Sequence, residues 1–213
     1  MNKELTELVF ILDRSGSMHG LEKDTIGGFN SMIEKQRKEE GDCLVSTVLF
    51  NHRSDVLYDR VSLKEIREME EKDYTPSGCT ALIDALGSAI RHIRNVHKYI
   101  REEDVPAHTI FVITTDGLEN ASHRYSSDQV KRMVSEQKEK GWEFLFLGAN
   151  IDAVETAKMY GIDEDRSVKF VNDSVGHMKN FSVLSEAITR FRGSGTIEPD
   201  WSEEIQEDYK KRG

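Results

Sequence analysis

Near the start of the chain, a carboxylate and two hydroxyl side chains stand at alternate positions. Asp13, Ser15 and Ser17 supply hard oxygen donors of the kind that Mg²⁺ or Mn²⁺ binds. Gly16 lies between the serines and has no side chain, so the backbone there can turn tightly around an ion. The same residue types also cap loops and helices, because their oxygens accept hydrogen bonds from free backbone N–H groups. Taken alone, the pattern leaves a metal site and a cap as open alternatives.

The elements around these residues favour a ligand-binding edge. The apolar run Leu8–Leu12 leads directly into Asp13, and the run 107–115 leads into Asp116. Short apolar runs bounded by turn residues are typical of strands that are buried on both faces of a parallel sheet. Open α/β sheets bind their ligands at the carboxyl ends of such strands. We therefore expect both carboxylates at one edge of the sheet.

A third polar turn, residues 74–80, ends where a strongly amphipathic helix begins. The buried stripe of that helix comprises Leu82, Leu86, Ile90, Ile93, Val96 and Ile100. In a fold that alternates strands and helices, this turn is expected to meet the two strand ends. It would bring the hydroxyl of Thr80 to the candidate site. The candidate metal ligands are then Asp13, Ser15, Ser17, Thr80 and Asp116. Carboxylates, hydroxyls and water together suit an octahedral Mg²⁺ or Mn²⁺.

The rest of the chain alternates between strands and helices. We expect further strands at 43–50, 55–61, 142–148 and 167–171, and helices at 20–38, 62–73, 82–100, 126–140, 153–160 and 177–191. The tight turn at 51–54 makes its two strands an antiparallel hairpin, because a parallel return needs about a dozen residues or more. The sequence therefore predicts an α/β fold: a doubly wound, mostly parallel, six-stranded Rossmann-like sheet with one antiparallel edge strand, flanked by helices.

One domain accounts for residues 1–192. The C-terminal tail, residues 193–213, mixes small and charged residues and is expected to be loose or to dock through Trp201. Gly27 and Gly28 are unfavourable inside the expected first helix, by about 1 kcal/mol each relative to alanine. Close packing against the sheet is the expected reason for them.

The composition limits the classes of function. The 213 residues carry a formal net charge of −10, which argues against a general nucleic-acid binder, since such proteins present a basic face. Cys43 opens an apolar strand and is expected to be a buried, inert thiol, whereas Cys79 lies in a loop. The first residues have no signal-peptide layout, and no apolar run approaches the length of a membrane span. We therefore expect a cytoplasmic protein that has no membrane partner.

The polar turns resemble those of a known family. Asp13-x-Ser15-x-Ser17, a Thr80 that opens a helix after a glycine, and Thr115-Asp116-Gly117 look like the metal-ion-dependent adhesion site (MIDAS) of von Willebrand factor A (VWA) domains. The resemblance covers roughly residues 5–192 and matches all five motif positions. It is greatest to the free-standing intracellular members of bacteria and phages, which often act as scaffolds beside ATPases or within multiprotein complexes.

This resemblance implies roles for the five residues. Ser15, Ser17 and Thr80 would bind the ion directly, and Asp13 and Asp116 would bind it directly or through water. Mg²⁺ is the expected ion, with Mn²⁺ or Ca²⁺ as alternatives. In the family an open coordination position takes a carboxylate from a partner protein, so the resemblance implies a protein-interaction module and not an enzyme.

Two other functions remain open. A metal-dependent phosphatase of the haloacid dehalogenase type also places an aspartate after its first strand, but its usual second aspartate, two residues later, is Ser15 here. A metal-free assembly scaffold would use the hydroxyls only as caps. A nucleotide site is weaker still, because neither G-x-G-x-x-G nor G-x-x-x-x-G-K-[ST] occurs. Replacing Asp13 by alanine separates a ligand from a cap, since the loss of a cap costs only about 1 kcal/mol.

Three neighbours of the candidate ligands are expected to lie outside the ligand set. Glu119 and Asn120 follow Asp116 closely and are interpreted as residues of the loop surface, with a contact to the rim of the site or to a partner as the alternative. Arg14 lies between ligand positions and is expected to point away from the ion, towards an acidic group of a partner.

Overall fold

One mixed sheet lies at the centre of the molecule. The computed structural model describes residues 1–213, apart from the side chain of Lys3. The six strands lie in the order β3-β2-β1-β4-β5-β6. They are β1 Asn2–Asp13, β2 Asp42–Phe50, β3 Ser54–Ser62, β4 Pro106–Thr115, β5 Trp142–Gly148 and β6 Ser167–Lys169. β3 runs antiparallel to β2 at one edge and the other neighbours pair in parallel, so the predicted fold class is confirmed.

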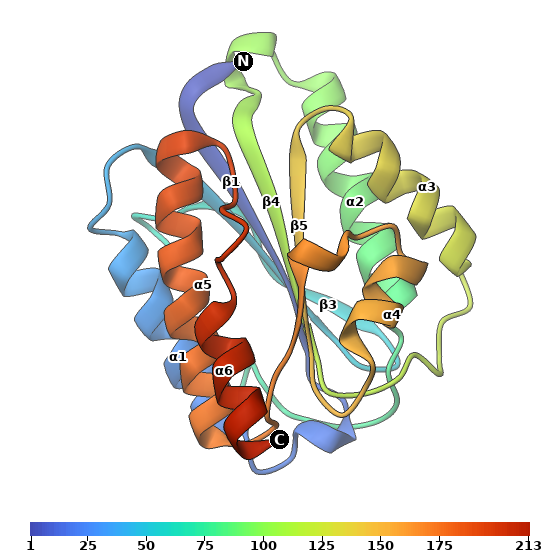
Figure 1. The fold of residues 1–213 in the computed structure, drawn as a ribbon. Coiled ribbons are helices and arrows are strands. Elements are labelled where there is room, and N and C mark those ends of the chain that lie inside the picture. Colours follow the sequence, from blue (N-terminus) through green and yellow to red (C-terminus); the bar gives the residue numbers. More distant parts are fainter.

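Two layers of helices cover this sheet, with α1, α5 and α6 on one face and α2, α3 and α4 on the other (Figure 1). They are α1 Glu22–Gln36, α2 Leu82–Tyr99, α3 Ser127–Lys138, α4 Ala153–Met159, α5 Ser174–Ser194 and α6 Glu203–Arg212. The first three follow the predicted spans closely, whereas α5 begins and ends three residues outside the predicted 177–191. Within the part of the chain that the structure describes, none of the helices has the length and apolar character needed to cross a membrane.

The continuous apolar run of β1 is explained by a core on each face of the sheet. Leu8 and Phe10 point into the core beneath α1 and α5, while Val9 and Ile11 point into the core beneath α2. All four side chains are fully buried, and each contributes about 1.5–3 kcal/mol by its removal from water. The run therefore has no solvent face, and Asp13 ends it with a polar group at the sheet edge.

Only one glycine of the pair in α1 is closely packed, and it packs against a helix and not against the sheet. A Cβ atom added to Gly28 would lie 2.2 Å from Cδ2 of Phe181 in α5, so only glycine allows this approach. An added Cβ on Gly27 would have no neighbour within 4 Å. The expectation of close packing is thus met at Gly28 alone, and its partner is α5.

The predicted helix at 62–73 is absent, and the described segment consists of turns after the end of β3. Its apolar residues are still buried in the core beneath α1, and side chains of α1 and of its C-cap bind the backbone of this segment. Asn30 donates to the Met69 carbonyl at 3.0 Å and accepts from its N–H at 2.9 Å, and Arg37 Nε donates to the Leu63 carbonyl at 2.9 Å. The spacing of these residues gave a helical period, but the segment forms turns of its own, such as Glu65 N–H to the Ser62 carbonyl at 2.8 Å, and its backbone is also bound from outside.

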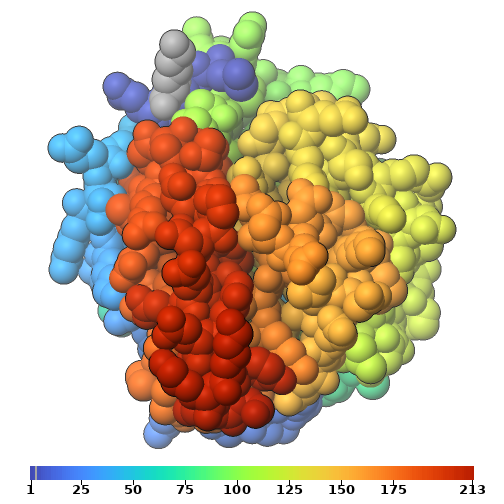
Figure 2. Space-filling view, in the orientation of Figure 1, coloured from blue at the N-terminus to red at the C-terminus, as the bar shows by residue number. Residues whose placement is uncertain are grey.

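After α5, the chain turns back along the same face of the molecule. Gly195 ends α5 with a φ of 75°, a left-handed conformation that favours glycine. Trp201 is buried, and its indole N–H donates to the Asp165 carbonyl at 2.8 Å. In Figure 2 the residues of α6, in dark red, lie flat against the surface formed by α5. This last helix is not anticipated by the sequence.

Candidate metal centre

The candidate site lies at the carboxyl ends of β1 and β4, which are neighbours in the sheet. The two strands pair in parallel up to Leu12 and Thr114, so Asp13 and Thr115 end them side by side. From β1 the chain continues to β2 on one side of this pair, and from β4 it continues to β5 on the other side. Such a switch in direction makes the loops diverge and leaves a crevice where ligands bind in open α/β sheets.

Hydrogen bonds join four of the predicted residues directly. The Ser15 N–H donates to Asp13 Oδ1 at 2.7 Å, and Ser15 Oγ lies 3.0 Å from Ser17 Oγ. Ser17 Oγ in turn donates to Asp116 Oδ1 at 2.6 Å. Ser17 and Asp116 are 99 positions apart in the chain, so this contact depends on the pairing of β1 with β4.

Thr80 joins the group across Gly117. A Cβ atom added to Gly117 would lie 3.3 Å from Thr80 Oγ1 and 3.8 Å from Ser17 Oγ. The missing side chain therefore leaves a space that hydroxyls from two loops border. The structure brings all five predicted residues together at one edge of the sheet.

The loop that carries Thr80 is tied to the loop after β1 by backbone hydrogen bonds. Gly16 N–H donates to the Gly78 carbonyl at 3.0 Å, and Ser77 N–H donates to the Arg14 carbonyl at 2.9 Å. Gly78 has a φ of 72°, and an added Cβ would lie 2.3 Å from the His52 ring. Both reasons make glycine necessary at this position.

Two residues after Asp116 fix the start of α2. Asn120 Oδ1 accepts from the Thr80 N–H at 2.9 Å, and its own N–H donates to the Thr80 carbonyl at 3.0 Å. Glu119 accepts from the Ile83 N–H and from the Ser122 N–H, each at 2.8 Å. Asn120 is exposed, as a loop-surface residue is expected to be, but it also holds Thr80 in place, and the half-buried Glu119 holds the first turn of α2.

Arg14 also has a partner within the chain. Its guanidinium pairs with Asp55 of β3, and its side chain is only 11% exposed. The expected acidic group of a partner is thus wrong for Arg14, because its acidic partner belongs to the same chain.

Several solved structures share this architecture, although no protein-family model and no curated protein sequence matches the chain. The vWF domain of the type V pili tip protein Mfa5 from Porphyromonas gingivalis is 12% identical over 91% of this chain and 98% of its own, with a TM-score of 0.62. Proximal thread matrix protein 1 (PTMP1) from the mussel byssus, with a zinc-occupied MIDAS motif, is 13% identical over 88% of this chain and 47% of its own, with a TM-score of 0.59. Manganese-loaded TRAP protein from Plasmodium vivax is 18% identical over 85% of this chain and 74% of its own, with a TM-score of 0.56.

The fold is that of a von Willebrand factor A domain. The predicted resemblance is thereby confirmed at the level of the fold, which is all that identities this low can show. The chain spans about half of the PTMP1 chain, 47% of its length.

The VWA fold here buries two carboxylates close together. Asp13, Ser15, Thr80 and Asp116 are each at most 4% exposed, whereas Ser17 faces solvent. Burial raises the pKa of Asp13, and the nearby charge of Asp116 raises it further, while hydrogen bonds from Thr115 and Ser15 lower it. Among the described side chains, the groups that donate to the two aspartates are all neutral hydroxyls and amides. The two aspartates of this VWA fold therefore have no cationic partner among the described side chains, which fits a bound cation.

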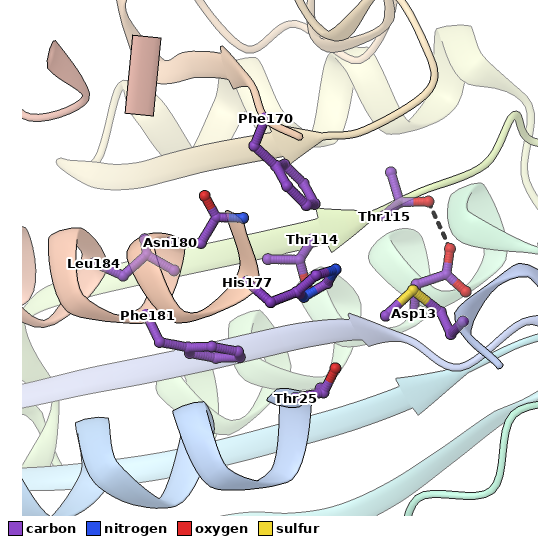
Figure 3. A pocket seen from close by; sticks show the side chains of 10 residues that line it. Asp13, Thr25, Thr114, Thr115, Phe170, His177, Asn180, Phe181 and Leu184 are labelled. Carbon is purple, nitrogen blue, oxygen red and sulfur yellow. Dashed lines mark hydrogen bonds between the residues drawn. The ribbon is translucent and has the colours of Figure 1, made fainter. Parts of the chain in front are cut away.

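Three supporting residues lie outside the predicted set. Thr115 Oγ1 donates to Asp13 Oδ2 at 2.6 Å, beside a small cavity of about 10 Å³ (Figure 3). The Tyr74 hydroxyl donates to the Asp13 carbonyl, and Asn172 Nδ2 donates to Asp116 Oδ2 at 3.1 Å. Thr115 stands inside the Thr-Asp-Gly motif, so the sequence could have indicated it. Tyr74 and Asn172 carry no local signal, because only the folded topology brings them to the aspartates.

The donor set determines which ions suit this site. Hydroxyl and carboxylate oxygens favour hard cations such as Mg²⁺ and Mn²⁺, whereas zinc prefers nitrogen and sulfur ligands. In the described part of the chain, no group of three or more His, Cys, Asp or Glu residues could hold a metal ion. A cation at this edge would therefore depend on the hydroxyls of Ser15, Ser17 and Thr80 as well as on the aspartates.

Proposed function

We propose that this chain is a protein-interaction module that binds a divalent cation through Asp13, Ser15, Ser17, Thr80 and Asp116. One observation carries the proposal: two buried carboxylates lie among three hydroxyls, and their described donors are all neutral. A buried, unpaired charge is costly, and a cation would offset that cost. Mg²⁺ or Mn²⁺ is the ion we propose, with Ca²⁺ as the alternative.

The hydroxyl ligands suit the binding of an anionic partner. A divalent ion held largely by neutral oxygens keeps positive charge and would attract a carboxylate at an open coordination position. Ser17 faces solvent and marks the side from which a partner would approach. Leu118, 65% exposed next to the site, would give that partner an apolar contact. We therefore propose a protein ligand that presents an aspartate or glutamate.

The solved structures support a divalent ion but do not decide which one. TRAP carries manganese and PTMP1 carries zinc at its MIDAS motif. For this chain we favour Mg²⁺ or Mn²⁺, because its candidate ligands are all oxygens. The choice between them needs a direct titration.

We infer binding and not catalysis at this site. In the phosphatase alternative, a carboxylate two residues after Asp13 would act as acid and base. Ser15 stands there, and its hydroxyl is hydrogen-bonded to Ser17. An alcohol is too weak an acid and base for that role at neutral pH.

Titration calorimetry with Mg²⁺ and Mn²⁺ on the EDTA-treated protein tests the proposal. We expect saturable binding that weakens by more than about tenfold in Asp13→Ala and in Ser17→Ala. Ser17 is exposed, so its replacement should leave thermal stability nearly unchanged. Ser31→Ala, on the exposed face of α1, is the matched control and should bind the ion normally.

Equal affinities in the wild type and in Asp13→Ala would show that these residues are not the ligands. Absent binding in the wild type would favour the metal-free scaffold. If binding is found, capture of a partner in Mg²⁺ but not in EDTA, and not by Ser17→Ala, would establish the interaction step.

A further inference from the structure

The two carboxylate oxygens of Asp116 have separate partners. Ser17 Oγ donates to Oδ1 at 2.6 Å, and Asn172 Nδ2 donates to Oδ2 at 3.1 Å. Asn172 lies between β6 and α5 and is 56 positions further along the chain than Asp116. Its amide therefore holds the oxygen of Asp116 that the serine motif does not reach.

The other end of the Asn172 amide is fixed by a histidine. Asn172 Oδ1 lies 2.9 Å from Nε2 of His177, in the first turns of α5. An amide oxygen can only accept, so this contact requires His177 to carry its proton on Nε2. His177 is buried, and its ring packs edge-on against that of Phe170, with 5.2 Å between the ring centroids. It also lines the cavity that borders Asp13 (Figure 3).

This geometry determines which way the Asn172 amide faces. A flipped amide would set its oxygen against the Asp116 carboxylate and its NH₂ group against the protonated Nε2 of His177. The contact with Asp116 would then be lost, since two acceptors would meet there, and His177 would keep its contact only with its proton on Nδ1. The Asn172 backbone is held as well, because the Asp173 side chain caps α5 at the Gly176 N–H, at 2.8 Å.

We propose that Asn172 is a positioning residue for Asp116, and that His177 acts through Asn172 by anchoring the far end of its amide. This inference depends on the proposed metal site, and it adds two residues that the Asp-x-Ser-x-Ser, Thr and Thr-Asp-Gly motifs do not contain. Asn172 keeps the Asp116 carboxylate turned so that Oδ1 faces Ser17. His177 touches neither Asp116 nor the serines through any hydrogen bond among the described side chains.

A double-mutant cycle on metal affinity tests this relay. We expect Asn172→Ala to weaken Mg²⁺ and Mn²⁺ binding by about 10- to 100-fold in titration calorimetry, as for other residues that orient metal ligands. Asn172→Leu, whose side chain branches at the same carbon as that of asparagine but cannot donate, should give the same loss. His177→Phe keeps an aromatic ring on Phe170 and removes the donor, so we expect a smaller loss.

The decisive comparison is the variant that carries both changes. Because His177 acts only through Asn172, Asn172→Ala/His177→Phe should bind no more weakly than Asn172→Ala alone. The electron paramagnetic resonance spectrum of bound Mn²⁺ should change in Asn172→Ala, which a purely structural role would not produce. Asn180→Ala, a buried asparagine of α5, is the control and should keep the wild-type spectrum.

The outcomes separate this inference from the proposed function. Wild-type affinity in both Asn172→Ala and Asn172→Leu would overturn the positioning role while the metal site stands. A further loss on adding His177→Phe to Asn172→Ala would overturn the relay through the amide. No binding by the wild type would overturn the proposed function, and the positioning role with it.

Discussion

At the scale of single residues, the candidate site depends on the absent side chain of a glycine as much as on its oxygen ligands. Gly117 leaves the space between Thr80 Oγ1 and Ser17 Oγ open. Its φ does not lie in the left-handed region, so the backbone itself would accept alanine. The requirement for glycine here comes from the space and not from the turn.

Gly117→Ala should therefore weaken Mg²⁺ binding without unfolding the protein. The new methyl group would lie 3.3 Å from Thr80 Oγ1 and crowd the proposed ion. We expect a loss of affinity of about tenfold or more in calorimetry, comparable to the loss of a residue that orients ligands. Gly193→Ala, where an added Cβ meets nothing within 4 Å, is the control. Unchanged affinity in Gly117→Ala would place the ion away from this space.

At the scale of elements, the sequence predicted what local pattern determines and missed what distant side chains determine. The runs before Asp13 and Asp116 are strands because their residues are buried on both faces, and burial of that kind leaves a local apolar pattern. The segment 62–73 has a helical period, yet Asn30 and Arg37 bind its backbone and hold it in turns. No residue pattern within that segment predicts its contacts with Asn30 and Arg37.

The glycine pair of α1 provides a matched test of the packing between α1 and α5. Gly27→Ala should stabilise the protein by up to about 1 kcal/mol, because alanine favours the helix and the added Cβ meets no neighbour. Gly28→Ala should destabilise it by about 1–3 kcal/mol, because the added Cβ forces the Phe181 ring to move. Urea unfolding measures both, and equal effects at the two positions would contradict the packing described here.

At the scale of the whole molecule, the site exists only because the topology places β1 beside β4. That neighbourhood follows from the doubly wound alternation of strands and helices, so all five ligand candidates could be predicted from sequence. The role of Asn172 could not be predicted, because it follows a strand of only three residues. No local sequence pattern indicates the direction that the chain takes after β6. The C-terminal segment is a similar case, since Trp201 hinted at docking but no pattern indicated α6.

We propose that residues 193–213 dock stably and contribute to the stability of the domain. Trp201 is 6% exposed and donates to the Asp165 carbonyl, and Ile197 and Ile205 are buried beside it. Trp201→Ala should lower the free energy of unfolding by about 3–5 kcal/mol, as for other buried aromatic residues. Tyr99→Ala, where the side chain is 77% exposed, should change it by less than about 0.5 kcal/mol. Equal unfolding curves for these two variants would mean that the tail is loose in solution.

The most direct test of a metal-dependent interaction module is anomalous X-ray diffraction from crystals grown with Mn²⁺. Our account predicts one strong anomalous peak within bonding distance of Ser15 Oγ, Ser17 Oγ and Thr80 Oγ1, with a coordination position open to solvent on the Ser17 side. The absence of a peak at this edge of the sheet, or a peak bound elsewhere while the site stays empty, would contradict it.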